Sequence, residues 1–278
     1  MSRTVMLIHG AWLTPASWDK FRARFSEQGY RVLAPAWPLL DGPPESLRRA
    51  PPPRLARVGI EDIVIHYTNI IATLDESPIL MGHSFGGLIV QRLLDKGLGA
   101  VGVAIDPAPP FGVLASPRAI WSSRAVFFSW GAWRRTMHMS QAAFAADFAQ
   151  TLPAHEMAAT YDAHIVPSPG RIFFQAVTGI GSRVSFRNPA RPPLLLIAGE
   201  LDHIVTPDMV RANHRLQARA ATPTDLRLFG RRSHWLCNDV GWEEVADYAL
   251  TWSAAHVWQS TGETLMLGDP LASGGHRL

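Results

Sequence analysis

A serine flanked by glycines lies between two apolar segments of the chain. Gly82-His83-Ser84-Phe85-Gly86 has the pattern G-x-S-x-G, follows the apolar run Ile79–Met81 and precedes a helical pattern over Leu88–Leu94. A serine on a sharp strand-to-helix turn presents its hydroxyl, and the flanking glycines let neighbouring backbone pass close by. The helix start supplies N–H donors for a developing oxyanion. The pattern therefore predicts Ser84 as a nucleophile, and a glycine-rich turn without chemistry is the alternative.

A carboxylate that could orient a catalytic base comes later in the chain, as this motif requires. Gly199-Glu200-Leu201-Asp202 follows the apolar run Leu194–Ala198. The carboxyl ends of strands in an open α/β sheet are where ligands bind. We predict Asp202 as the acid. Glu200 is a weaker candidate, and Asp106, which follows the preceding strand, is the main rival.

The predicted base is His234, which follows the predicted strand Thr224–Phe229 and precedes the last predicted helix. From that loop an imidazole can reach the serine and accept its proton. His83 and His203 adjoin the nucleophile and the acid, and we interpret them as structural or pocket residues. No histidine pair has metal-ligand spacing, so we expect no metal site.

The loop His9-Gly10-Ala11-Trp12 follows the first predicted strand. One of its N–H groups, with that of Phe85, could form an oxyanion hole; Ala11 is our first choice and Trp12 the second. An ordinary glycine turn is the alternative. The residues that we expect to line a substrate pocket are Trp12, His83, Trp130, Met137 and Trp235.

Short apolar runs alternate with helical patterns along the chain, which is typical of an α/β fold with a mostly parallel sheet flanked by helices. The rhythm breaks in a stretch rich in aromatic residues, which we interpret as an inserted helical cap. We expect a core formed by residues 1–106 and 191–258, a cap at 107–190, and a loose C-terminal tail at 259–278. Residues 35–54 contain seven prolines and predict an irregular loop.

Bulk properties exclude several classes of protein. The chain has 278 residues, a formal net charge of +3 and scattered arginines, so we expect no nucleic-acid partner. The single cysteine, Cys237, allows no internal disulfide. No apolar run approaches the length of a membrane span or a signal peptide, so we expect a cytoplasmic protein without stable membrane insertion. The arginines near Trp121 leave interfacial lipid contact open, and a homodimer also stays open.

Together, the loop Ile8–Trp12, the motif around Ser84, Gly199–Asp202 and Ser233-His234-Trp235 resemble the α/β-hydrolase superfamily. The His-Gly-Ala-Trp loop is similar to the branch that holds small methylesterases, hydroxynitrile lyases and cofactor-free perhydrolases. The resemblance implies a triad of Ser84, Asp202 and His234, oxyanion donors at Ala11 and Phe85, and a helical cap. It also implies six strands, because the chain begins at the third strand of the family.

Two departures from this branch argue against cyanohydrin cleavage. Similar hydroxynitrile lyases carry threonine where Gly10 stands and lysine where Trp235 stands. We therefore expect a serine hydrolase that needs no cofactor and cleaves a carboxylic ester, lactone or thioester of an apolar small molecule through an acyl-enzyme. A lyase or perhydrolase with the same triad, and a non-catalytic ligand-binding protein, are the alternatives.

Overall fold

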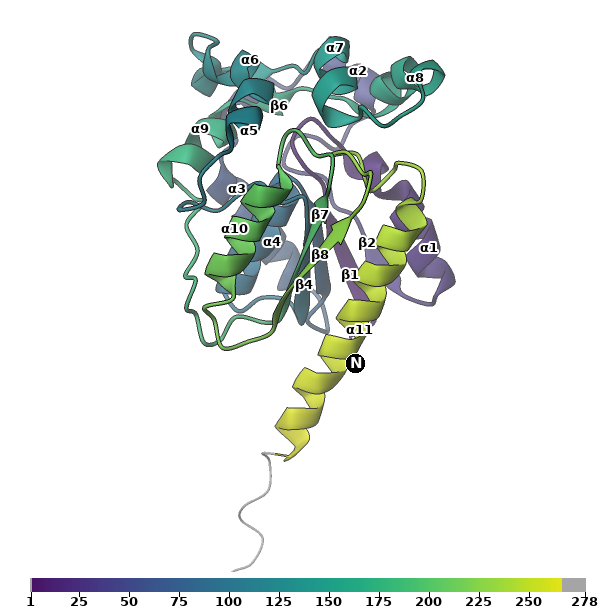
Figure 1. Cartoon of the computed structure of the whole chain (residues 1–278), viewed down its shortest axis with the longest axis vertical. Coiled ribbons are helices and arrows are strands. Elements are labelled where there is room, and N and C mark those ends of the chain that lie inside the picture. Colours follow the sequence, from purple (N-terminus) through teal and green to yellow (C-terminus); the bar gives the residue numbers. More distant parts are fainter. Residues whose placement is uncertain (1, 267–278) are drawn as a thin grey trace, which may run out of the picture.

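Six parallel strands form the central sheet of the protein. The computed structural model describes residues 2–266. Neighbouring strands are parallel throughout the sheet, whose spatial order is β2-β1-β3-β4-β7-β8 (Figure 1). The strands are β1 (Thr4–Ile8), β2 (Arg31–Leu33), β3 (Ile79–His83), β4 (Val101–Ile105), β7 (Leu194–Gly199) and β8 (Thr224–Phe229). The predicted six-stranded α/β sheet is confirmed.

The four central strands are buried along their whole length. Alternate side chains of a strand point to opposite faces of the sheet, so each strand contributes to two cores. In β1, Val5 and Leu7 belong to one apolar cluster, whereas Met6 and Ile8 belong to the other. Burial on both faces explains why these strands are continuous apolar runs in the sequence.

Helices cover both faces of the sheet (Figure 1). Helices α1 (Asp19–Glu27) and α11 (Trp242–Met266) pack on the face that holds Val5. Helices α3 (Ile60–Ile71), α4 (Phe85–Asp95) and α10 (Pro207–Gln217) pack on the opposite face. Because β3 and β7 run parallel in the same sheet, their carboxyl ends, which precede α4 and α10, lie at the same edge of the sheet.

The chain between β4 and β7 forms a helical insertion above the carboxyl ends of the strands (Figure 1). The short strands β5 (Thr136–Met137) and β6 (Ser168–Pro169) pair antiparallel within it. A π-helical turn at Phe144–Phe148 continues α7. The helices of the insertion are α5 (Pro117–Ser122), α6 (Arg124–Phe127), α7 (Gln141–Ala143), α8 (Ala154–His164) and α9 (Arg171–Thr178).

Two segments differ from the expectation. The proline-rich loop contains a short helix, α2 (Pro44–Arg49), because Pro44 stands in the first turn, where a missing N–H costs nothing. The last helix, α11, continues to Met266, so the first residues of the predicted loose tail are helical. The rest of that tail, 267–278, lies outside the described residues.

Gly102 of β4 allows α4 to approach the sheet closely. A Cβ atom added there would lie 2.8 Å from Cγ1 of Val90 and would collide with Cδ1 of Leu94. Both side chains belong to α4 and are fully buried, so they have little room to move. The spacing between this helix and the strand therefore depends on glycine.

We expect Gly102→Ala to lower the free energy of unfolding by about 1–3 kcal/mol, because overpacking displaces buried side chains. Without the clash, alanine in a strand interior is roughly 0.5–1 kcal/mol more favourable than glycine. The sign of the change in the free energy of unfolding therefore tests whether Gly102 is in tight contact with α4. Urea denaturation measures the change. The control is Gly42→Ala, whose Cβ would be 3.6 Å from Leu47. An alanine at 102 that stabilises the protein would refute the packing argument.

Candidate active site

Ser84 occupies a strained turn between β3 and α4. Its φ of 56° and ψ of −122° lie outside the regions that non-glycine residues prefer, at a cost of about 1–3 kcal/mol. Hydrogen bonds fix this conformation: its N–H donates to the carbonyl of Ile105 at 2.9 Å, and its carbonyl accepts from the N–H groups of Gly87 and Ala108, each at 2.9 Å. The turn that G-x-S-x-G predicts is therefore present.

Three glycines make room for this turn. A Cβ on Gly86 would collide with the carbonyl oxygen of Ile8, and one on Gly82 would collide with the carbonyl of Gly86. A Cβ on Gly10 would lie 2.8 Å from Cβ of Ser84. The loop after β1 thus passes directly against the serine side chain.

Asp202 and His234 form a buried pair at the ends of β7 and β8. Nδ1 of His234 lies 2.6 Å from Oδ2 of Asp202, and neither side chain is exposed to solvent. The other oxygen, Oδ1, accepts hydrogen bonds from the backbone N–H groups of Ile204 at 2.7 Å and Val205 at 2.9 Å. Both carboxylate oxygens are therefore engaged, which fixes the plane of the imidazole.

Burial makes His234 a neutral imidazole. Desolvation disfavours its charged form and lowers its pKa to about 3. Nδ1 faces the carboxylate, whereas Nε2 is buried and has no hydrogen-bond partner among the described residues. A neutral ring held through Nδ1 has its lone pair on Nε2, so this atom can accept a proton.

His83 and Phe148 hold the imidazole from two sides. Nε2 of His83 lies 2.8 Å from the backbone carbonyl of His234, and the two rings are 4.6 Å apart between centroids. The edge contact between Phe148 and His234 has a centroid distance of 4.8 Å. The residue that precedes Ser84 thus touches the predicted base.

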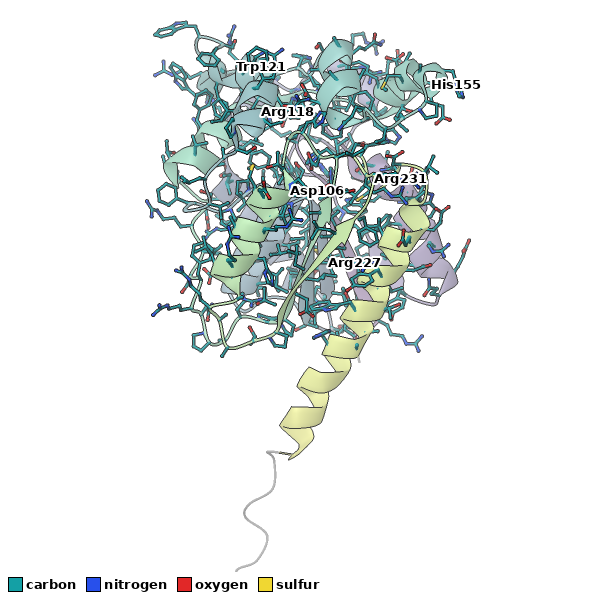
Figure 2. The ribbon with its side chains drawn as sticks, in the orientation of Figure 1. Asp106, Arg118, Trp121, His155, Arg227 and Arg231 are labelled. Atoms are coloured by element: carbon teal, nitrogen blue, oxygen red, sulfur yellow. The ribbon has the colours of Figure 1, made fainter. Side chains whose placement is uncertain are left out.

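Asp106, the rival acid, contacts the same cluster in a different way. Its side chain is fully buried, and Oδ1 accepts a hydrogen bond from the N–H of Gly199 at 2.8 Å. Burial and then the adjacent charge of Asp202 raise the pKa of Asp106 well above its usual range. Figure 2 labels Asp106 below the insertion, near the strand ends. The acid that meets His234 is Asp202.

Asp106 holds a proton more tightly than the neighbouring Asp202 does. Burial raises the pKa of Asp202, but the N–H groups of Val205 and Ile204 and the carboxyl of Asp106 act against this rise. Asp202 also faces His234, whereas Asp106 accepts one backbone N–H. Hydrogen bonds to a carboxylate favour its charged form. Asp202 therefore has the lower pKa of the two carboxyls and is the one that ionises first.

The same cluster offers potential metal ligands. Single ligand atoms of His83, Asp106 and His234 lie within 4.8 Å of one another. One nitrogen of each imidazole is already engaged, with a backbone carbonyl and with Asp202. The residues are arranged around a proton acceptor, which suits acid–base chemistry.

The predicted oxyanion donors lie beside the serine. Phe85 is the first residue of α4, so its N–H lies outside the helical hydrogen-bond ladder. Ala11 is buried in the loop that touches Ser84 through Gly10. Trp12 follows with a φ of 62°, in the left-handed region, which turns the chain at this point. Both N–H groups therefore come from segments that adjoin the serine.

Ser84 lines a cavity of about 520 Å³ beneath the helical insertion. Most of the lining is apolar, and Phe173 of α9 contacts Trp12 and Phe85 at ring-centroid distances of 4.8 and 5.0 Å. Asp147 is the one acidic side chain in the lining; it pairs with Arg118 at 3.5 Å. A volume of this size accommodates a small organic ligand.

Four of the five predicted pocket residues do not line this cavity, whereas Trp12 does. Nε2 of His83 faces the backbone carbonyl of His234, and Trp235 packs against Phe148 with a centroid distance of 5.9 Å. Met137 lies in β5 and is only partly buried, and Trp130 is 88 % exposed. The fold of the insertion decides which aromatic side chains face this cavity.

No pattern in the sequence indicates two further residues of the site. Phe148 covers His234, but it is one aromatic residue among many in the insertion. Thr151 donates to Oγ of Ser233 at 2.7 Å and also contacts Oδ2 of Asp239. It therefore joins the insertion to the loop that carries His234.

Comparison with known proteins agrees with this geometry. The profile described as the alpha/beta hydrolase family matches residues 5–248, and the chain belongs to this family. No curated protein matches the sequence.

Similar solved structures share the fold. A monoacylglycerol lipase from Paleococcus ferrophilus is 20 % identical, with a TM-score of 0.66, and the match covers 91 % of this chain and 94 % of that one. A pyrethroid hydrolase from Sphingobium faniae is 18 % identical, with a TM-score of 0.66 and coverages of 92 % and 98 %. A methylesterase from Arabidopsis is 14 % identical, with a TM-score of 0.64 and coverages of 90 % and 98 %.

The buried proton on Asp106 predicts a pH dependence of stability. A folded-state pKa above the unfolded value of about 3.9 means that the native protein binds a proton that the unfolded chain releases. The contribution of Asp106 to the free energy of unfolding therefore falls as pH rises above about 4, until the pH reaches the folded-state pKa. The lowered pKa of His234 contributes in the opposite direction below about pH 6.5, so the effect of Asp106 is read from the difference between variant and wild type. Asp106→Asn should reduce this fall, because the amide has no proton to release.

Urea denaturation across this pH range measures the difference between Asp106→Asn and the wild type. The matched control is Asp75→Asn, at an exposed position. It should keep the wild-type slope. A parallel pH profile for Asp106→Asn and the wild type would show that Asp106 is ionised in the native protein.

Proposed function

We propose that this protein is a serine hydrolase that cleaves a carboxylic ester, a lactone or a thioester of an apolar small molecule. One observation carries the proposal: a serine in a strained turn lines an apolar cavity, and a buried Asp202–His234 pair lies at the same sheet edge. The ring of His83, the residue before Ser84, is 4.6 Å from that of His234. Nucleophilic catalysis by a hydroxyl needs a base near the nucleophile, and this adjacency supports that role for His234.

In the first step, Oγ of Ser84 attacks the carbonyl carbon of the substrate, and its proton passes to Nε2 of His234. The ionised Asp202 holds the imidazole in the required tautomer and stabilises the imidazolium that forms. The oxyanion accepts hydrogen bonds from the N–H groups of Ala11 and Phe85. Loss of one such donor typically costs about 3 kcal/mol of transition-state stabilisation.

The tetrahedral intermediate then collapses. The bond from carbon to the leaving oxygen or sulfur breaks, His234 returns its proton to the leaving group, and the acyl group remains on Ser84. A water molecule attacks this acyl-enzyme, and His234 accepts the water's proton. When the second intermediate collapses, the acid leaves and the serine regains its proton.

The cavity lining supports an apolar substrate. Phe173, Phe85 and Trp12 surround the serine, and burial of an apolar group against them contributes about 25 cal/mol per Å². The names of similar structures agree with this class, since they include a monoacylglycerol lipase, a pyrethroid hydrolase and a methylesterase.

Ser84→Ala should lower kcat for p-nitrophenyl ester hydrolysis by at least about 10⁴-fold, because the variant lacks the nucleophile. Circular dichroism should be unchanged, because alanine retains the Cβ that packs against Gly10. A fluorophosphonate probe followed by mass spectrometry should label the wild type at Ser84. The matched control is Ser26→Ala, an exposed serine of α1, which should keep full activity.

The outcomes separate the alternatives. Ester cleavage that persists in Ser84→Ala would exclude the proposed nucleophile. A wild type that neither hydrolyses an ester panel nor reacts with the probe would favour a ligand-binding protein. A halide indicator detects peracid. Halide oxidation that occurs only with both the ester and added peroxide, and at a rate above that of ester hydrolysis, would favour a perhydrolase.

A further inference from the structure

The helical insertion exposes an unusual number of large apolar side chains. Trp130 and Phe128 are 88 % and 83 % exposed, and Leu114 is 86 % exposed. We call the following set the apolar rim: Phe111, Leu114, Ile120, Trp121, Phe128, Trp130 and Val177. A concentration of exposed apolar side chains of this kind marks an interaction surface.

The apolar rim surrounds the entrance of the cavity that Ser84 lines. Phe111, Leu114, Ile120, Phe128 and Val177 each belong both to the rim and to the cavity lining.

Ring contacts connect Trp130 of the rim to the cavity wall. Trp130 contacts Trp133 at a centroid distance of 5.7 Å, Trp133 contacts Phe174 at 5.8 Å, and Phe174 contacts Phe127 of the lining at 5.5 Å. The surface and the site therefore form one continuous apolar region.

The segment that carries most of the rim is also cationic. Residues 107–146 contain no aspartate or glutamate, and they contain the four arginines Arg118, Arg124, Arg134 and Arg135. Arg118 pairs with Asp147, whereas the other three form no ion pair among the described residues. The guanidinium of Arg124 lies over the ring of Trp121 at 4.2 Å. Figure 2 shows Trp121 and Arg118, both of α5, in the insertion at the end of the molecule opposite to the last turns of α11.

We propose that the apolar rim docks this protein onto the headgroup region of an anionic lipid bilayer. Tryptophan and phenylalanine partition into the membrane interface, and neighbouring arginines are attracted to anionic lipid headgroups. No helix in the described part of the chain is long and apolar enough to cross a bilayer, so the contact is peripheral. Docking directs the cavity entrance toward the lipid.

This geometry gives an apolar ligand a path from the bilayer to Ser84 that avoids water. The docking surface stands on the exposed side chains and the unpaired arginines, and it does not depend on the chemistry at Ser84. Ser84→Ala should therefore bind vesicles as the wild type does.

Co-sedimentation with vesicles tests the proposal. The full-length protein is mixed with vesicles of phosphatidylcholine alone or of phosphatidylcholine with phosphatidylglycerol. We expect binding to the anionic vesicles, weaker binding to the neutral ones, and loss of most binding at high salt, which screens the arginines. An absence of binding to anionic vesicles at low salt would overturn the proposal.

Substitutions locate the contact. Arg134→Gln with Arg135→Gln should lower the partition coefficient by about fivefold for each arginine. Phe128→Ala with Trp130→Ala should lower it by at least about tenfold. All four side chains are exposed, so circular dichroism should show an intact fold. Equal binding by these variants and the wild type would overturn the assignment to the rim.

Control variants carry the same chemistry elsewhere on the surface. Arg219→Gln removes an exposed charge that lies after α10, and Ile65→Ala removes an exposed apolar side chain of α3. Both should bind vesicles as the wild type does. Sedimentation velocity without lipid tests whether the rim instead binds a second copy of the protein. A wild-type dimer that the double variant Phe128→Ala with Trp130→Ala converts to monomer, together with no vesicle binding by the wild type, would overturn the bilayer proposal in favour of a protein interface.

Discussion

Close contact between three backbone segments at Ser84 determines the geometry of the site. The end of β3, the loop after β1 and the start of α4 approach until no side chain fits at Gly10, Gly82 or Gly86. This contact holds the serine in a conformation that an isolated peptide would avoid. Because β1 and β3 are adjacent parallel strands, the loop that follows one reaches the turn that follows the other.

Burial sets the charge state of the groups around the serine. A neutral His234 and two carboxyls with raised pKa values, Asp202 and Asp106, share a region from which water is excluded. In such surroundings a hydrogen bond to a charged group is strong, but an unpaired charge is costly. The two backbone N–H donors to Asp202 therefore favour its charged form, which can then hold the imidazole.

Local patterns in the sequence sufficed to predict the sheet and the serine turn, because buried strands and G-x-S-x-G are short and contiguous. The choice between Asp106 and Asp202 was harder, since both follow buried strands. Distance in space separates them: Asp202 faces Nδ1 of His234, while Asp106 accepts the N–H of Gly199.

The cavity wall was predicted poorly. The insertion consists of short helices and turns, so no long periodic pattern indicates which side chains point inward. Trp130 is exposed although its type favours burial, and Phe148 covers the imidazole although its surroundings in the sequence resemble those of other phenylalanines. The hydrogen bonds of Thr151 to Ser233 and Asp239 tie this wall to the loop of the base. Displacement of the insertion at Thr151 would therefore break a hydrogen bond of Ser233, the residue that immediately precedes the imidazole.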